Sequence, residues 1–450
     1  MLSPGDTALF TDLYELTMAA SYFAHDMHGP ATFELFVREL PPRRGYLVAC
    51  GLDDALEQLE RLRFDDVAIR FLASLDLFDD AFLDALAGLR FRGEVWAMPE
   101  GEVVFAGEPL VRVTAPLIEA QLVETLLLNR IGFDTLVATK ASRIATACGD
   151  RPFFDFSARR DHGTDAALRA ARAACIGGAA GTSLVLAGQR FGLELSGTMA
   201  HSYVMSFADE RDAFAALARD FPGRATLLLD TYDTEAAAYR VVELADELRR
   251  DHALPSAVRL DSGDLDALAR RVRRILDDGD LGDVRIFASG NLDEYRIADL
   301  VASGAPVDAF GVGTQLGTGG DAPHLDVVYK LTEDAAGPKS KFSVGKATVP
   351  GRKQVYRTTE NGRHRHDVVA LHDEAQPAGR PLLECVMVDG RRTRASAPIA
   401  ALRERAARAT AGLPPHVRAL EPLDPPYEVR LSPGLRALLA AGKPATAPTS

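Results

Sequence analysis

The sequence predicts an α/β protein whose central part forms a barrel or barrel-like sheet of parallel strands. From about residue 152, short apolar runs alternate with helical patterns at a spacing of roughly 20–40 residues, the size of a βα unit. Six such runs occur, and each ends in Asp, Ser, Gly or Thr. Apolar strands that alternate with helices form parallel sheets covered on both faces. Six units favour a barrel over a small open sheet, and ligands bind such sheets at the carboxyl ends of the strands.

The part of the chain before the repeating pattern mixes helices and strands. The expected elements are a helix over 16–25, a strand over 31–40, a turn and amphipathic helix over 45–62, and short strands over 93–116. Residues 118–148 are predominantly apolar and predict one or two long buried helices.

The central strands are predicted from their apolar runs. These are RPFFDFS (151–157), LELSGT (193–198), ATLLLDT (225–231), AVRLDSG (257–263), VRIFASG (284–290) and VDAFGVGT (307–314), with helical patterns such as 234–250 and 264–278 between them. The pattern weakens after residue 330. There we expect a hairpin of 366–374 with 382–392 and a helix over 399–413, and we expect the tail 440–450 to be disordered.

Composition limits the class of partner. With 51 Lys and Arg against 64 Asp and Glu, the net charge is −13, and no basic block is present. Such a chain is a poor candidate for binding nucleic acid or an anionic membrane. The four cysteines (Cys50, Cys148, Cys175 and Cys385) show no CxxC spacing, which favours free thiols in a reducing compartment over a zinc site. Without a signal-peptide pattern or an apolar stretch of membrane length, we expect a cytoplasmic protein.

Polar and charged side chains follow the predicted strands. The segments concerned are 155–160, 197–202, 230–234, 259–264, 289–291 and 311–314. Because the carboxyl ends of parallel strands meet at one edge, we expect these side chains to converge. Arginine pairs with phosphate or carboxylate through two N–H groups, and Gly-rich turns expose backbone N–H groups that suit phosphates. The pattern predicts a site for a phosphorylated, anionic small molecule.

Some of these features have purely structural alternatives. Asp261 or Ser262 could cap the following helix, and Phe156 could be a core residue. The turn 311–314 matches neither the full dinucleotide-binding pattern nor the P-loop. Arg259 is harder to explain structurally, because a strand buried on both faces seldom holds an arginine without a partner.

Over most of its length the sequence resembles the nicotinate phosphoribosyltransferases. The motifs, in the family's order, are TDLYELTMA (11–19), FELFVRELPPRRGYLVACGL (33–52), DFSARR (155–160), SGTMAHS (196–202), VRLDSGD (258–264), FASGNLDE (287–294), AFGVGTQL (309–316) and KFSVGKATVPGRKQVYR (341–357). The sequence is also similar to the nicotinamide and quinolinate phosphoribosyltransferases, which share the fold. We therefore expect an N-terminal α/β domain over 1–118, an irregular α/β barrel over 119–330, and a C-terminal region over 331–450 that packs back on the N-terminal domain.

The resemblance implies an ATP-dependent enzyme of NAD biosynthesis. Such an enzyme joins nicotinate to 5-phosphoribosyl 1-diphosphate and releases nicotinate mononucleotide and diphosphate. ATP hydrolysis is coupled to synthesis through a phosphohistidine, which the motif places at His201; a neutral imidazole can attack the γ-phosphate. Mg²⁺ would be carried by the pyrophosphate oxygens, with few direct protein ligands. A homodimer whose active sites contain residues of both subunits is also implied.

For the pyridine ring, the resemblance implies contacts from several motifs. Tyr14 would cover the ring from the partner subunit, Phe156 would stack on the other face, and Thr198 would contact nicotinate. Arg159 would lie near the ring or the product phosphate. Ser183 stands where nicotinamide-type relatives carry a carboxylate, so it favours the acid as substrate.

For the phosphoribosyl group, the implied contacts come from the strand ends. The residues expected are Arg259 for the substrate anion, Asp261 for the ribose hydroxyls, Gly290, Gly313 and Thr314 for the 5′-phosphate, and Lys140 and Arg143 for the pyrophosphate. Departure of pyrophosphate leaves an oxocarbenium-like ribose, so catalysis is expected to rest on positioning and charge neutralisation.

Two other functions compete with this one. The first is a nicotinamide or quinolinate phosphoribosyltransferase; Ser183 and the intact GTMAHS motif speak against it. The second is a non-catalytic sensor of phosphorylated ligands on the same fold. A decayed enzyme would be expected to lose some of the polar residues at the strand ends, and all of them are present here.

Overall fold

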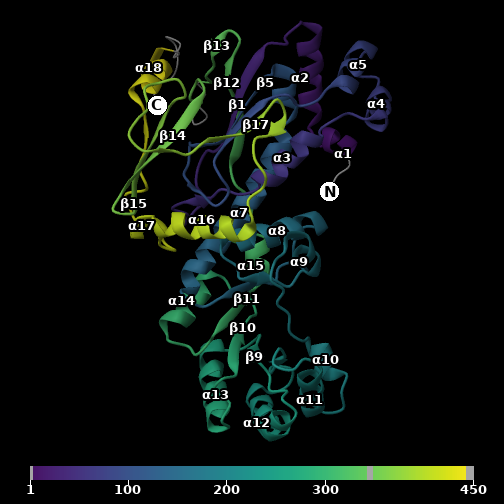
Figure 1. Cartoon of the computed structure of the whole chain (residues 1–450), viewed down its shortest axis with the longest axis vertical. Helices are drawn as coiled ribbons and strands as arrows, with labels where there is room; N and C mark the ends of the chain where they lie inside the picture. The colour runs from purple at the N-terminus through teal and green to yellow at the C-terminus, as the bar shows by residue number, and fades with distance from the viewer. Residues whose placement is uncertain (1–3, 342–347, 442–450) are drawn as a thin grey trace. The chain divides into compact units, whose positions relative to one another are not determined.

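The computed structural model describes residues 4–341 and 348–441. The chain forms two compact units, which we describe separately (Figure 1). The N/C unit contains the residues up to Thr139 and those from His324 onward, and the central unit is Lys140–Pro323. The expected motif at 341–357 lies partly outside the described residues, and so does most of the tail 440–450.

A seven-stranded sheet interleaves the two ends of the chain in the N/C unit. Its order is β13 (Gly337–Pro338), β12 (Val327–Asp334), β1 (Pro30–Val37), β5 (Pro109–Pro116), β3 (Glu94–Ala97), β17 (Glu384–Val388) and β18 (Arg391–Arg392), with neighbouring strands antiparallel. In β1, Leu35 pairs with Val111 on one side and with Tyr329 on the other. The interior side chains of this sheet are buried, as the apolar run in β1 predicts.

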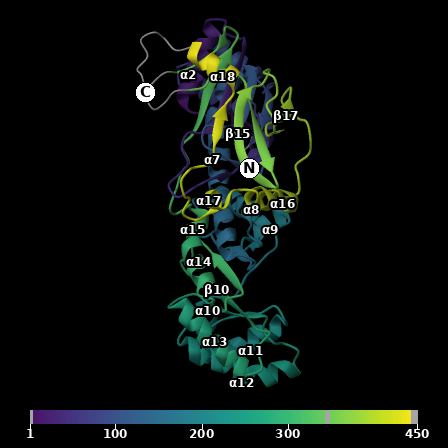
Figure 2. The ribbon, with the colours of Figure 1, turned by 90° about the vertical axis from the view of Figure 1, so that its left-hand side faces the viewer.

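The predicted hairpin of 366–374 with 382–392 is wrong. β15 (Arg363–Leu371) pairs instead with β14 (Lys353–Glu360), across a turn in which Asn361 and Gly362 both have positive φ. An Asn-Gly pair is a strong hairpin signal, because both residues accept this conformation. The strand β17 joins the larger sheet beside β3. β14 and β15 lie in a second sheet of four strands, between β16 (Arg380–Pro381) and β19 (Val429–Leu431), and α18 (Pro433–Ala441) packs on β15 (Figure 2).

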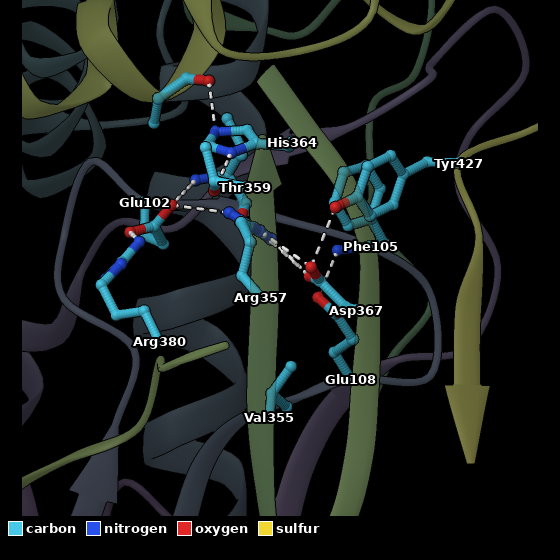
Figure 3. Close-up of polar contacts among 12 residues, drawn as sticks. Glu102, Phe105, Glu108, Val355, Arg357, Thr359, His364, Asp367, Arg380 and Tyr427 are labelled. Atoms are coloured by element: carbon cyan, nitrogen blue, oxygen red, sulfur yellow. Dashed lines mark hydrogen bonds and ion pairs between the residues drawn. The ribbon is translucent and has the colours of Figure 1, made fainter. Parts of the chain in front are cut away.

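A buried ion-pair cluster ties the second sheet to an N-terminal loop (Figure 3). Arg357 is fully buried and donates to Asp367, with a shortest distance of 2.6 Å, and to Glu102 at 2.7 Å. Tyr427 donates to the same Asp367 carboxylate. Burial raises the pKa of Glu108 well above its ordinary value, and the neighbouring Asp367 carboxylate raises it further. Buried charges are tolerated when they are paired in this way.

The remaining elements of the N/C unit surround these sheets. They are α1 (Pro4–Leu9), α2 (Leu13–Ala24), α3 (Leu52–Arg61), α4 (Asp66–Ala73), α5 (Asp80–Gly88), α6 (Leu117–Leu122), α16 (Ile399–Ala411) and α17 (Pro415–Arg418), with the short pair β2 (Leu47–Val48) and β4 (Val103–Val104). Asp65 and Asp79 cap α4 and α5 by accepting backbone N–H bonds. The long helix α7 (Glu124–Cys148) begins in the N/C unit and ends in the central unit.

The central unit contains a six-stranded sheet of parallel strands, as predicted. Its order is β7 (Gly181–Thr182), β6 (Phe153–Asp155), β11 (Ala309–Val312), β10 (Arg285–Ala288), β9 (Ala257–Leu260) and β8 (Thr226–Leu228). Within residues 140–323, no ladder joins the outer strands β7 and β8, so the irregular barrel is open there. Apolar side chains such as Val258 and Ile286 are fully buried in this sheet.

Helices alternate with these strands. They are α8 (Thr164–Gly177), α9 (Val185–Phe191), α10 (His201–Met205), α11 (Glu210–Asp220), α12 (Thr234–Arg250), α13 (Leu265–Asp278), α14 (Glu294–Ala302) and α15 (Thr314–Gly317). The helices α11, α12 and α13 pack side by side (Figure 1). Asp264 caps α13 by accepting the Ala267 N–H, so neither Asp261 nor Ser262 is needed for that purpose.

One of the six predicted strands is misplaced. The segment LELSGT contacts the sheet only through a single bridge between Leu195 and Thr182. The strand that pairs with β6 in its place is β7. Leu195 is 50% exposed, so the segment lacks the buried apolar contacts that stabilise an inner strand. In the described residues, all four cysteines are free, and no helix has the length and apolar character needed to cross a membrane.

Candidate active site

A cavity of about 200 Å³ lies at the carboxyl ends of β6, β9, β10 and β11 in the central unit. It is lined by Phe156, Arg159, Arg160, Arg259, Asp261, Ser289, Gly290, Asn291, Leu292, Gly311, Gly313, Thr314 and Gln315. Four of the six predicted strand-end segments therefore converge here, whereas 197–202 and 230–234 supply no lining residue. Strand ends of parallel sheets are where ligands bind in this class of fold.

Arg259 is the centre of the polar contacts in the cavity. It projects from the inner strand β9, where its Nε donates to Ser289 Oγ at 2.8 Å and its Nη1 donates to Thr198 Oγ1 at 2.7 Å. Its Nη2 donates to Asp261 Oδ1 at 2.5 Å. The guanidinium carbon also lies 5.7 Å from the centre of the Phe156 ring. Each nitrogen of Arg259 thus has a partner that fixes the plane of the guanidinium group.

Asp261 is held as a carboxylate. Burial alone would raise its pKa, but the hydrogen bond from Ser289 and the charge of Arg259 lower the pKa of Asp261 below its ordinary value. A protonated His201 would act in the same direction. An ionised carboxylate accepts hydrogen bonds only, which suits it to bind hydroxyl groups.

Phe156 is part of an aromatic wall. Its ring stacks on Phe287, with centroids 5.7 Å apart and an interplanar angle of 16°. Gly311 makes room for this arrangement, because a Cβ there would lie 2.7 Å from the Phe156 ring and 2.8 Å from the Phe287 ring. The structural alternative for Phe156 is therefore partly correct: it packs in the core on one side and lines the cavity on the other.

Gly290 brings two strand ends into close contact. It has φ +89°, and a Cβ at this position would lie 1.7 Å from the backbone oxygen of Asp261. Only glycine fits both the conformation and the space. On the other side of the cavity, a Cβ on Gly313 would lie 3.1 Å from the Phe156 oxygen. The backbone around the cavity is therefore closely packed at both Gly-rich turns.

His201 is the first residue of α10 and does not line this cavity. Its Nδ1 lies 3.2 Å from Thr231 Oγ1, at the carboxyl end of β8. Thr198, from the same loop, reaches Arg259 and also lines a second cavity of about 400 Å³ among the amino ends of the strands.

Most of the chain matches models of known protein families. Residues 9–132 match the model described as the nicotinate phosphoribosyltransferase (NAPRTase) N-terminal domain, and residues 152–346 match that of the nicotinate phosphoribosyltransferase (NAPRTase) family. The chain belongs to the nicotinate phosphoribosyltransferase family.

Individual relatives agree with the family match. The chain is 50% identical over 94% of its length to a Mycobacterium tuberculosis protein named nicotinate phosphoribosyltransferase pncB2, covering 91% of that protein. It is 42% identical over 82% of its length to a Bacillus subtilis nicotinate phosphoribosyltransferase, covering 76% of it. The crystal structure of the human nicotinic acid phosphoribosyltransferase superposes with a TM-score of 0.87, at 30% identity, over 96% of this chain and 100% of that one. The resemblance noted in the motifs is thereby confirmed.

Lys140 and Arg143, expected at the pyrophosphate, do not line this cavity. Both are 1% exposed on α7 and bind Glu294: Lys140 Nζ lies 2.6 Å from Glu294 Oε2, and Arg143 Nε donates to Oε1 at 2.9 Å. Lys140 also pairs with Asp321 at 2.6 Å. These buried pairs anchor the start of α14, and neither basic residue lines the cavity. Their expected contacts with pyrophosphate remain a prediction.

Two other expected residues lie away from the cavity lining. Ser183 is exposed just after β7, and its backbone N–H donates to the Asp155 oxygen at 2.9 Å. Tyr14 is 48% exposed on α2 in the N/C unit. Partial burial and the nearby Glu124 carboxylate raise the pKa of Tyr14, so its hydroxyl stays protonated. The roles expected for both residues remain predictions.

Several residues that line the cavity were given no individual role from the sequence. They are Arg160, Ser289, Asn291, Leu292, Gly311 and Gln315. Most of them lie next to a predicted residue in one of the family motifs. Their position directly after a strand was therefore the feature that could have indicated a place in the site. Ser289 carried no signal of its own, because a buried serine becomes informative only when its partners are known.

Proposed function

We propose that this protein is a nicotinate phosphoribosyltransferase that joins nicotinate to 5-phosphoribosyl 1-diphosphate. The C1–O bond to the diphosphate breaks, the pyridine nitrogen bonds to C1, and the products are nicotinate mononucleotide and diphosphate. The observation that carries the proposal is the Arg259–Asp261 pair inside the strand-end cavity, in a chain of this family.

The cavity supplies complementary groups for both substrates. The Phe156 ring offers an apolar face to the pyridine, and Arg259 offers a cation near that face for the carboxylate. Asp261 accepts hydrogen bonds from ribose hydroxyls. Arg159 and Arg160 are exposed and line the cavity, where their guanidinium groups can bind phosphate oxygens. Fixed charges of this kind stabilise the departing diphosphate without reorganisation during the reaction.

ATP, Mg²⁺ and a second subunit complete the proposal. His201 is the residue we propose to carry the phosphoryl group from ATP, and Thr231 fixes one of its ring nitrogens. Mg²⁺ accompanies the substrate on its diphosphate oxygens. No group of three or more His, Cys, Asp or Glu side chains suited to a metal ion occurs in residues 4–341 and 348–441. We propose a homodimer in which Tyr14 of the partner subunit completes each active site.

The pyridine substrate is tested by comparing three compounds. Diphosphate release is measured with nicotinate, nicotinamide and quinolinate, each with and without ATP. We expect a kcat/KM for nicotinate at least about a hundredfold above that for nicotinamide, since a buried polar group left without a partner costs roughly 1–3 kcal/mol or more. Equal kcat/KM values for the two would contradict the proposal, and binding without turnover of any pyridine would favour a sensor.

A further inference from the structure

The hydroxyl group of Ser289 touches both charged residues of the cavity. Ser289 Oγ accepts the Arg259 Nε–H at 2.8 Å and donates to Asp261 Oδ1. The serine is 2% exposed and follows directly on β10. Its backbone N–H donates to the Leu260 oxygen at 2.9 Å, which holds it beside the end of β9. The position of the hydroxyl is therefore set by the sheet.

These contacts occupy one oxygen of the Asp261 carboxylate. Both Ser289 and Arg259 Nη2 donate to Oδ1. Within the described residues no hydrogen bond reaches Oδ2, although Asp261 is only half-buried and lines the cavity. An ionised carboxylate has lone pairs on both oxygens, so Oδ2 is left for a ligand. The same hydroxyl occupies Arg259 Nε, which leaves the two terminal nitrogens to face other partners.

We propose that Ser289 is a positioning residue for the phosphoribosyl transfer, because its hydroxyl locks the Arg259–Asp261 pair in the orientation that presents Asp261 Oδ2 to the ribose hydroxyls. The inference rests on the proposed function and deepens it. Ser289 acts through its two charged neighbours and needs no contact with the substrate. A serine is suited to this task because a single hydroxyl both accepts from the arginine and donates to the carboxylate.

Loss of the hydroxyl affects orientation and protonation together. In Ser289→Ala, Arg259 Nε loses its acceptor and Asp261 loses a donor, so both side chains can rotate. Hydrogen bonds to charged groups are strong enough for a fall of about ten- to a hundredfold in kcat/KM for 5-phosphoribosyl 1-diphosphate. Burial, which raises the pKa of Asp261, is then opposed by the charge of Arg259 and by a protonated His201 without Ser289, so the pKa of Asp261 rises. Activity should therefore fail at a higher pH than in the wild type as the solution is acidified.

The test compares four enzymes: wild type, Ser289→Ala, Ser289→Thr and Ser303→Ala. Ser303 is a matched control, because its Oγ also donates to a carboxylate, Asp266, that an arginine holds, but on the surface beside α14. The measurements are kcat and KM for each substrate between about pH 5 and pH 8.5. We expect Ser289→Ala to lose kcat/KM with a raised acidic limb, while Ser289→Thr and Ser303→Ala keep the wild-type pH profile.

The outcomes separate the inference from the function on which it rests. A wild type without turnover of any pyridine contradicts the proposed function. An active wild type with Ser289→Ala inside twofold of it at every pH overturns the role of Ser289 alone. Equal losses in Ser289→Thr and Ser289→Ala, without a change in pH profile, would show a packing effect and also overturn it. Should Ser289→Ala not fold, Ser289→Cys keeps the volume with a weak donor and takes its place under the same expectations.

Discussion

His201 lies apart from the cavity that holds Arg259 and Asp261, and its Nδ1 lies 3.2 Å from Thr231 Oγ1. Forming the glycosidic bond needs a leaving group and a stabilised cation, and neither requires an imidazole base. We therefore expect His201→Asn to abolish ATP hydrolysis and the stimulation by ATP, while slow synthesis without ATP persists at high 5-phosphoribosyl 1-diphosphate. Incubation with γ-labelled ATP should give an acid-labile phosphate on the wild type and none on the variant.

The result that would contradict this assignment is a variant that still hydrolyses ATP in step with product formation. His201 would then be a structural residue whose ring is hydrogen-bonded to Thr231.

Substitution of Gly290 tests whether the site needs the close approach of the β9 and β10 ends. A Cβ there would lie 1.7 Å from the Asp261 oxygen, so Gly290→Ala must push the β9 and β10 ends apart and should abolish binding of 5-phosphoribosyl 1-diphosphate. Gly304→Ala is the matched control, since its φ of +68° is also positive but nothing lies within 4 Å of the added atom. The control should lose about 1 kcal/mol of stability from the strained φ and keep its activity. Titration calorimetry measures the affinity of each variant for 5-phosphoribosyl 1-diphosphate. Equal affinities in the two variants would contradict the account.

At the scale of single residues, the sequence predicts those charged or aromatic site residues that lie in or directly after an apolar strand. Arg259, Asp261 and Phe156 are of this kind, and all line the cavity. For Lys140 and Arg143 the sequence shows a basic residue in a helix but not its partner, and the pyrophosphate contacts expected of them stay a prediction. Their partner is Glu294, which lies 151 positions after Arg143 in the chain, and only the folded structure brings them together.

At the scale of elements, the buried Arg357 joins β14 to β15 and to the loop that holds Glu102. Arg357→Met would leave the buried Asp367 without its cationic partner and Glu102 with Arg380 alone. An uncompensated buried charge costs about 3–5 kcal/mol. Arg380→Met removes a second partner of Glu102, but this arginine side chain is 54% exposed, so the expected loss is below about 1 kcal/mol. Chemical denaturation of both variants measures the difference. Similar losses would show that burial of the ion pair does not govern the stability of this sheet.

Elements with a strong local signal were predicted and those that depend on distant pairing were not. The amphipathic helices and five of the six central strands follow from apolar spacing. The sixth, β7, has only Gly181 and Thr182, too short for a pattern, while the apolar LELSGT segment forms a single bridge. The hairpin of β14 and β15 had a local signal in Asn361–Gly362, but pairing of β17 with β3 joins residues far apart in the chain.

At the scale of the whole molecule, the proposed dimer predicts complementation between subunits. Tyr14→Ala and Asp261→Ala should each be inactive, whereas mixed dimers contain one site in which both residues are intact. Mixing the two variants should therefore restore partial activity, up to about a quarter of the wild type if subunits exchange at random and each site needs one residue from each subunit. Absence of recovery, with subunit exchange confirmed by differently tagged chains, would count against a shared site.

The central claim is that this chain transfers the phosphoribosyl group to nicotinate. The most direct measurement follows 5-phosphoribosyl 1-diphosphate by phosphorus NMR in the presence of the purified protein, nicotinate, Mg²⁺ and ATP, with Asp261→Ala as the inactive reference. The account predicts that the wild type forms nicotinate mononucleotide and diphosphate in equal amounts, and that the initial rate falls about a hundredfold or more when nicotinamide replaces nicotinate at the same low concentration. It would be contradicted if 5-phosphoribosyl 1-diphosphate remained intact, or if it were hydrolysed to ribose 5-phosphate without incorporation of the pyridine.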